Sequence, residues 1–195
     1  MKLIGVLLFD GVEELDAVGP WEVLAWWTQN FPQDGYEVTM VSPDGRPVAA
    51  AKGMLLTPHT SRAGLPELEV LLHPGGVGTR ALAVDPEHLR WMRELRASTP
   101  LMSSVCTGSL VYAAAGLLTD RPATTYWGAL DHLTEYDPTI TVKPESRWVD
   151  DGDTITSAGV SAGIDMALHL VRRLAGAERA REVRRGIQYD PLPPV

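Results

Sequence analysis

The sequence contains a single cysteine, Cys106, among its 195 residues. One cysteine rules out a disulfide within the chain, which fits a reducing compartment. No apolar stretch approaches the length needed to cross a bilayer. The apolar run 3–9 is too short for a secretion signal, and acidic residues follow it at once without a small-residue cleavage site. We therefore expect a cytoplasmic protein with no membrane partner.

Positive charge is also scarce, and it is scattered. The chain has 17 Lys and Arg against 25 Asp and Glu, for a formal net charge of −8, and no basic run could line a phosphate backbone. This composition argues against nucleic-acid binding. No histidines or acids have the spacing of metal ligands, so we expect no metal site. Repeats and linkers are absent too, and the length with 45% hydrophobic residues predicts a single domain over 1–195.

The chain does contain short apolar runs bounded by turn residues, which is the pattern of strands buried on both faces of a parallel sheet. Helical patterns separate most of these runs, so the sequence predicts an α/β fold with a mostly parallel central sheet between two helical layers. The predicted strands are 3–9, 37–41, 70–72 and 101–105.

Capping signals predict where two of the helices begin. Asp85 is a suitable N-cap for a helix over 86–98, with Pro86 at its first position. By the same rule Pro20 opens a helix over 21–29, because a proline at the first position loses no hydrogen bond.

Two segments resemble hairpins rather than helices. The stretch 46–57 predicts a short excursion without a helix, and the turn 150–153 joins two strands at 147–149 and 154–157. Two more helices and an extended tail close the chain, at 164–174, at 178–185 and at Pro191, Pro193 and Pro194.

Cys106 stands at the point where a strand pattern gives way to a helix pattern. Ser104 and Gly108 flank it at two residues on either side, which is the spacing of a nucleophile elbow with cysteine in place of serine. A helix N-terminus stabilises an anion, so we expect the pKa of this thiol to be lowered. A merely buried cysteine is the alternative, since free cysteine is often buried. The elbow context favours a nucleophile.

Ligands of an open parallel sheet collect beyond the carboxyl ends of its strands. Gly75 and Gly76 follow the run 70–72, where the backbone can approach a ligand closely, although an ordinary tight turn would need the same residues. We expect the backbone N–H groups of Gly76 and Thr107 to form an anion-stabilising pocket.

Asp16 follows the first predicted strand and has apolar neighbours on both sides. Burial would raise its pKa, which makes it a candidate general acid or a hydrogen-bond partner of the sulfur. The alternative is a capping role at the helix that follows. We expect Glu13 and Glu14 to face water. His73 ends a strand and could either act as a base or point into the sheet, so the residues alone predict no Cys–His pair.

With these features in place, the chain resembles the DJ/PfpI superfamily, which shares the flavodoxin-like fold of class I glutamine amidotransferases, a three-layer α/β/α sandwich. The segments most similar to its isocyanide hydratase branch are 15–20, 104–110 with 114–118, 123–127 and 162–165. Regulators that join such a domain to a DNA-binding helix-turn-helix are similar as well. Because the chain stops at Val195, we expect no such appendage here.

The resemblance implies roles for particular residues. Cys106 would be the nucleophile, Asp16 the acid, and Thr107 the neighbour whose hydroxyl assists, in the hydration of an isocyanide to an N-substituted formamide through a thioimidate. Tyr126, Trp127 and Gly75 are candidates for the substrate pocket. No cofactor is implied, and relatives suggest a homodimer with the sites near the subunit contact.

Other activities within the superfamily stay open. A glyoxalase, deglycase or peptidase is one alternative, although Tyr126 stands where many such relatives carry histidine. A non-catalytic protein that senses a ligand or an oxidant through Cys106 is another.

Overall fold

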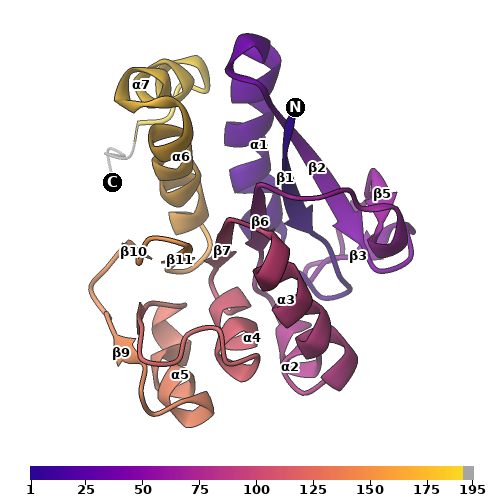
Figure 1. Ribbon diagram of the computed structural model, residues 1–195, viewed down its shortest axis with the longest axis vertical. Coiled ribbons are helices and arrows are strands. Elements are labelled where there is room, and N and C mark those ends of the chain that lie inside the picture. The colour runs from indigo at the N-terminus through magenta and orange to yellow at the C-terminus, as the bar shows by residue number, and fades with distance from the viewer. Residues whose placement is uncertain (191–195) are drawn as a thin grey trace.

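The computed structural model describes residues 1–190, so the predicted proline tail lies outside the described residues. Its centre is a seven-stranded sheet in the order β10-β11-β7-β6-β1-β2-β5 (Figure 1). Neighbouring strands are parallel except β10 and β11. The strands are β1 (Lys2–Leu7), β2 (Tyr36–Ser42), β5 (Thr60–Ser61), β6 (Val70–His73), β7 (Leu101–Val105), β10 (Trp148–Asp150) and β11 (Thr154–Ser157).

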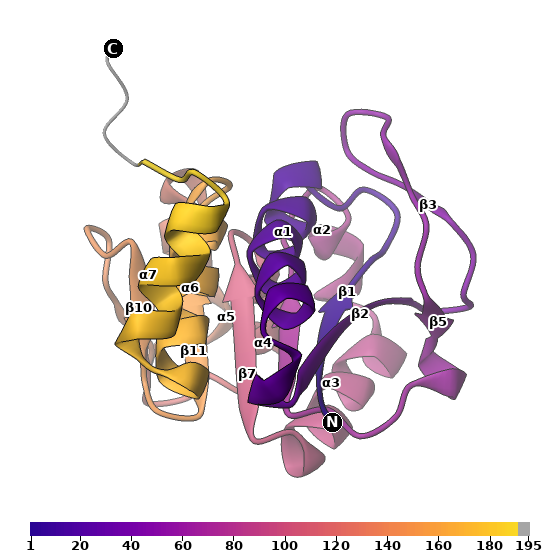
Figure 2. The same ribbon diagram turned by 90° about the horizontal axis from the view of Figure 1, so that it is seen from above.

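Helices cover both faces of this sheet. One layer consists of α1 (Glu14–Asn30), α6 (Ala162–Ala175) and α7 (Ala177–Gly186), which pack against one another. The other consists of α3 (Pro86–Ser98), α4 (Gly108–Ala114) and α5 (Leu130–Tyr136), with the short α2 (Thr79–Leu82) beside them (Figure 2). The three-layer α/β/α sandwich that the sequence predicted is confirmed.

The central strands are continuously apolar because both of their faces are buried. In β6, Val70 and Leu72 belong to the cluster under α1 and α6, whereas Leu71 belongs to the cluster under α3 and α4. Alternate residues of a strand point to opposite faces, so each residue of such a run is needed by one layer or the other. Burying each of these side chains contributes roughly 1.5–3 kcal/mol.

Smaller elements decorate this core. The predicted hairpin within 46–57 is confirmed as the antiparallel pair β3 (Val48–Ala49) and β4 (Leu55–Leu56). The remaining elements are the parallel pair β8 (Pro122–Ala123) and β9 (Thr141–Val142) and three 3-10 turns, Pro32–Asp34, Arg62–Gly64 and Trp127–Ala129.

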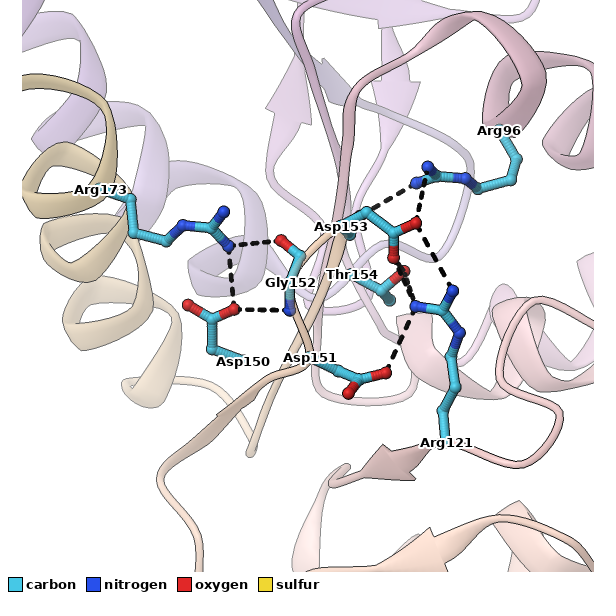
Figure 3. Close-up of polar contacts among 8 residues, drawn as sticks. All are labelled: Arg96, Arg121, Asp150, Asp151, Gly152, Asp153, Thr154 and Arg173. Atoms are coloured by element: carbon cyan, nitrogen blue, oxygen red, sulfur yellow. Dashed lines mark hydrogen bonds and ion pairs between the residues drawn. The ribbon is translucent and has the colours of Figure 1, made fainter.

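The second predicted hairpin is also confirmed, and arginines from three directions hold its turn (Figure 3). Arg96 of α3 and Arg121 both bind the Asp153 carboxylate, the former at 3.0 Å. Arg173 of α6 binds Asp150 Oδ1 at 2.9 Å and the Gly152 carbonyl at 2.6 Å. These contacts attach the hairpin to both helical layers and so fix where β11 begins.

The strand order reverses direction at β1. From β1 the chain first adds β2 on one side through α1, and β6 and β7 then follow on the other side. A crevice opens at the carboxyl ends of strands where the order reverses in this way. The turns after β1, β6, β7 and β11 are therefore the expected lining of a site.

The start of the first helix differs from the prediction. Instead of opening a helix over 21–29, Pro20 lies inside α1, which begins at Glu14. A proline there removes one hydrogen bond within the helix. Pro20 packs closely against α6. A Cβ placed on Gly163 of α6 would lie only 3.2 Å from Pro20 Cγ. The predicted start of α3 is confirmed, since Asp85 accepts a hydrogen bond from the Glu87 N–H.

Candidate active site

Cys106 lies directly between β7 and α4 with a left-handed backbone, φ +56°. This conformation is strained for any residue other than glycine, and such strain is concentrated at functional sites. The backbone around it is held on both sides, because Thr125 Oγ1 donates to the Cys106 carbonyl at 2.8 Å and the Cys106 N–H is shared by the carbonyls of Ser157 and Ala158. The predicted elbow is present.

Glycines allow the neighbouring turns to close around this elbow. A Cβ on Gly108 would lie 2.2 Å from the His73 carbonyl oxygen, and one on Gly75 would lie 2.5 Å from the Thr107 nitrogen and 2.8 Å from Asp16 Oδ2. No larger residue fits at either position without moving the backbone. Gly75 therefore lies at the site as a close-packed support.

Asp16 occupies the first turn of α1 and is fully buried. Its Oδ2 accepts a hydrogen bond from the Gly75 N–H at 2.9 Å, whereas its Oδ1 has no partner of ordinary hydrogen-bonding geometry among residues 1–190. Burial raises the pKa of this carboxyl to about 7, and the Gly75 N–H and the contact with the Cys106 thiol offset part of that effect. Asp16 can thus hold or release a proton near neutral pH.

The pKa of the Cys106 thiol moves opposite to the prediction. Burial and then the charge of Asp16 raise it to about 12, although the N–H groups of Thr107 and Val160 face the sulfur and favour the anion. The N–H groups that face the sulfur do not outweigh these two effects. The pair therefore keeps at least one proton at neutral pH.

Thr107 is held in place by a closed group of hydrogen bonds. Its Oγ1 accepts from the Gly76 N–H at 3.0 Å and lies 3.0 Å from Thr79 Oγ1, which donates to the Gly76 carbonyl at 2.7 Å. The Gly76 N–H, predicted to face an anion, is thus engaged by the Thr107 hydroxyl. The sequence analysis does not identify Thr79. Its position three residues after the diglycine turn is the only sequence feature that points to it.

A cavity of about 860 Å³ opens above the Cys106–Asp16 pair, and Cys106, Thr107 and Gly76 line it. Its apolar wall comes from Ala83, Leu110, Tyr126, Ala129 and Val160. Of the predicted pocket residues, Tyr126 belongs to this wall, but Gly75 and Trp127 are not part of the lining, and Trp127 is 76% exposed. The site is large enough for a bulky organic substrate.

Charged residues lie at the cavity rim. Glu13, which we expected to face water, lines the cavity and forms an ion pair with Lys52 of the β3–β4 hairpin. The Glu14 side chain is only 13% exposed and accepts the Lys52 N–H at 2.6 Å, so that expectation was wrong for it as well. Both carboxylates fasten the hairpin to the start of α1, the helix that carries Asp16.

Val160 is a site residue that the sequence reasoning missed. It lies beyond the end of β11 with φ +51°, which is a rare conformation for a β-branched residue. Its N–H faces both the Asp16 carboxyl and the Cys106 thiol. The only signal available was Gly159, two residues beyond the predicted strand 154–157.

The histidines supply no base to Cys106. His73 is fully buried, with Nδ1 at 2.7 Å from the Pro74 carbonyl oxygen and Nε2 at 3.1 Å from His88 Nε2. His132 lines the cavity but is paired with Glu135. Within residues 1–190, no group of three metal-ligating side chains lies together, and no helix there is both long and apolar enough to span a bilayer.

Comparison with known proteins agrees with this architecture. The chain is 41% identical to an isonitrile hydratase of Pseudomonas putida over 98% of its own length and 80% of that protein. It is 35% identical to the transcriptional regulator CdhR of Pseudomonas aeruginosa over 78% of its length, which is 45% of the regulator.

Solved structures of related proteins have the same fold. A ThiJ/PfpI family protein from Pseudomonas syringae matches 100% of this chain and 77% of its own with a TM-score of 0.86 at 34% identity. DJ-1beta of Drosophila melanogaster matches 97% of this chain and 98% of its own with a TM-score of 0.84 at 25% identity. The model of the DJ-1/PfpI family matches residues 2–173. The chain therefore belongs to the DJ-1/PfpI family.

Proposed function

We propose that this protein is a cysteine-dependent hydratase that converts isocyanides to N-substituted formamides, with Cys106 as nucleophile and Asp16 as proton carrier. One observation carries the proposal: a buried carboxyl with a pKa of about 7 lies against the only thiol, below a cavity with more apolar than polar surface, and its Oδ1 has no partner of ordinary hydrogen-bonding geometry among residues 1–190. The isonitrile hydratase relative supports the choice of substrate class.

The first step consumes the thiol proton. Asp16 Oδ1 accepts the proton of Cys106 as the sulfur lone pair forms a bond to the terminal carbon of R–N≡C. The electron pair of the broken π bond moves to nitrogen, and the lone pair that the isocyanide carbon already carried takes the proton back from Asp16. The product is a thioimidate, R–N=CH–S–Cys106, and the carboxylate is regenerated.

Water resolves this intermediate in the second step. A water molecule adds to the thioimidate carbon while the nitrogen gains a proton, which gives R–NH–CH(OH)–S–Cys106. The C–S bond breaks, the hydroxyl proton returns to the sulfur through Asp16, and the formamide R–NH–CHO leaves. The Thr107 hydroxyl and the N–H groups of Thr107 and Val160 are in position to stabilise the water and the departing sulfur. The Gly76 N–H joins them only if the Thr107 hydroxyl turns away from it.

The test is formamide production from a panel of alkyl and aryl isocyanides. We expect turnover by the wild type, loss of it in Cys106→Ser, and a drop of about 10²–10⁴-fold in Asp16→Asn. The exposed Asp131→Asn variant is a matched control that should keep wild-type turnover. Because the fully protonated pair lacks a base, kcat/KM should rise with pH through a midpoint near 7. Equal turnover in all four proteins would refute the proposed mechanism.

A ligand or redox sensor is the second candidate, because the relatives include transcriptional regulators with such a domain. No turnover across the panel together with a ligand retained on purification would favour it. A glyoxalase, deglycase or peptidase is less well supported, since His73 is bonded away from Cys106. Lactate formed from methylglyoxal would support the glyoxalase alternative. The homodimer and the cytoplasmic location stay predictions.

A further inference from the structure

A continuous chain of hydrogen bonds runs behind the site from α3 to Asp16. His88 Nε2 lies 3.1 Å from His73 Nε2, and His73 Nδ1 lies 2.7 Å from the Pro74 carbonyl oxygen. The Gly75 N–H donates to Asp16 Oδ2 at 2.9 Å. Because the Pro74 carbonyl and the Gly75 N–H belong to one peptide group, the histidine pair and the carboxyl are joined through a single peptide.

The partners determine where the ring protons lie. The Pro74 carbonyl can only accept, so His73 Nδ1 must carry the hydrogen. A neutral imidazole has one N–H, so His73 Nε2 accepts and His88 Nε2 donates. Burial lowers the pKa of His73 to about 3 and that of His88 to about 4, which keeps both rings neutral above pH 5. Every hydrogen bond of the chain therefore points toward Asp16.

Aromatic rings enclose the histidine pair. Phe9 and Tyr112 pack against His73, and Trp91 packs against His88. The neighbours that titrate or carry charge are Tyr112 at His73, Asp85 and Arg62 near His88, and Glu13 and Cys106 at Asp16. In such an enclosed setting a hydrogen bond polarises the next one in the chain.

We propose that His73, held by His88, is a positioning residue that polarises the Pro74–Gly75 peptide, strengthens its N–H bond to the Asp16 carboxylate, and so sets the proton exchange between Asp16 and Cys106. This inference rests on the proposed role of Asp16 as proton carrier. Loss of the His73 Nδ1 donor weakens the Gly75 N–H bond, and Asp16 then holds its proton to higher pH.

Two substitutions at His73 separate the two ends of its ring. The amide nitrogen of His73→Asn falls near the place of Nδ1 and keeps the donor to Pro74. The amide end of His73→Gln falls near the place of Nε2, where its oxygen can accept from His88 Nε2–H, and no donor to Pro74 remains. Because Cys106 is the only cysteine, its alkylation by iodoacetamide from pH 5 to 9 reports on the pair in the full-length protein. In the plot of alkylation rate against pH, the inflection that disappears in Asp16→Asn is the one that Asp16 causes.

We expect His73→Gln to raise the Asp16 inflection by about half a pH unit or more, roughly a threefold change in the ionisation constant, and His73→Asn to stay within about 0.2 unit of wild type. Equal shifts in both variants, or none in either, would overturn the proposal. If the inflection in the alkylation rate persists in Asp16→Asn, both this proposal and the role of Asp16 as proton carrier are wrong. If His73→Gln shifts the inflection but the wild type forms no formamide from isocyanides, only the proposed hydratase activity is wrong.

A measurement on the wild type avoids any effect of substitution on folding. In protein with ¹⁵N-labelled histidine, the ring nitrogens of His73 should show the neutral Nδ1–H tautomer from pH 5 to 8. A ring protonated at Nε2, or charged within this range, would break the chain at its first link and overturn the proposal.

Discussion

Burial of Asp16 raises its pKa, and the same burial lowers the free energy of unfolding when the carboxyl is charged. Its pKa rises from 3.8 to about 7, so the folded protein binds a proton there between these values and the unfolded chain does not. Stability is therefore lost as the pH rises from about 4 to about 7. Above pH 7 the cost is on the order of 4 kcal/mol.

Asp16→Asn should remove that cost. The amide oxygen keeps the bond to the Gly75 N–H, and no charge is buried, so we expect unfolding in urea at pH 8 to require about 2–4 kcal/mol more than in the wild type. At pH 4 the gain should shrink, because the wild-type carboxyl is then neutral in the folded state. The exposed Asp131→Asn is the control. A gain independent of pH would show that the charge of Asp16 is not the cause.

At the scale of residues, the sequence predicted chemistry better than it predicted ionisation. Cys106 was identifiable because small residues at fixed spacing are required at an elbow. The direction of its pKa was not, because that depends on burial and on the distance to Asp16, two properties that exist only after α1 and β7 come together. Val160 and Thr79 were missed for the same reason.

The hairpin of β10 and β11 shows how one element supports the site from a distance. Its turn is bound by Arg96, Arg121 and Arg173 (Figure 3), and the end of β11 accepts the N–H of Cys106. The single side chain of Arg121 contacts three residues of the turn, Asp151, Asp153 and Thr154. Disrupting these ion pairs should therefore also disturb the backbone at Cys106, which is bonded to the end of β11.

We expect Arg121→Met to lower the free energy of unfolding by about 1–2 kcal/mol, because the arginine belongs to a half-buried network rather than to a single surface pair. The loss should be smaller in 1 M salt, which screens the ion pairs. Arg90→Met is the control, since the Arg90 guanidinium lies 3.9 Å from Glu94 with both side chains largely exposed. Equal, salt-independent losses in the two variants would contradict this expectation.

At the scale of elements, strands and hairpins followed from local signals, but the start of α1 did not. Proline is favoured at a first helical position, so the sequence predicts that a helix starts at Pro20. The helix continues through it because tertiary packing against α6 overrides that local preference. As a result, Asp16 lies on a helix instead of in a loop.

The molecule as a whole leaves apolar surface beside the cavity mouth. Leu55 and Met54 of the β3–β4 region are 73% and 52% exposed, and Val77 and Leu15 are 55% and 37% exposed. Their chain neighbours Lys52, Gly76 and Glu13 line the cavity rim. Such surface fits the predicted homodimer with its sites near the contact.

Light scattering after size exclusion tests this arrangement. The wild type should have roughly twice the chain mass of 21.2 kDa, and Leu55→Glu should shift it toward the monomer because a charge would be buried in the contact. Ala97→Glu, at an exposed position of α3 whose chain neighbours do not line the cavity, should leave the mass unchanged. A monomeric wild type would refute the dimer, and a dimer in both variants would place the contact elsewhere.

The sequence by itself determined the alternation of strands and helices, the elbow at Cys106 and the diglycine turn, because periodicity and small residues act over a few neighbouring positions. Only the tertiary structure decided that Asp16 is buried against the thiol, that Glu13 turns to the cavity and that His73 faces away from it. These arrangements join segments dozens of residues apart, and the charge of a buried group depends on all of its neighbours at once.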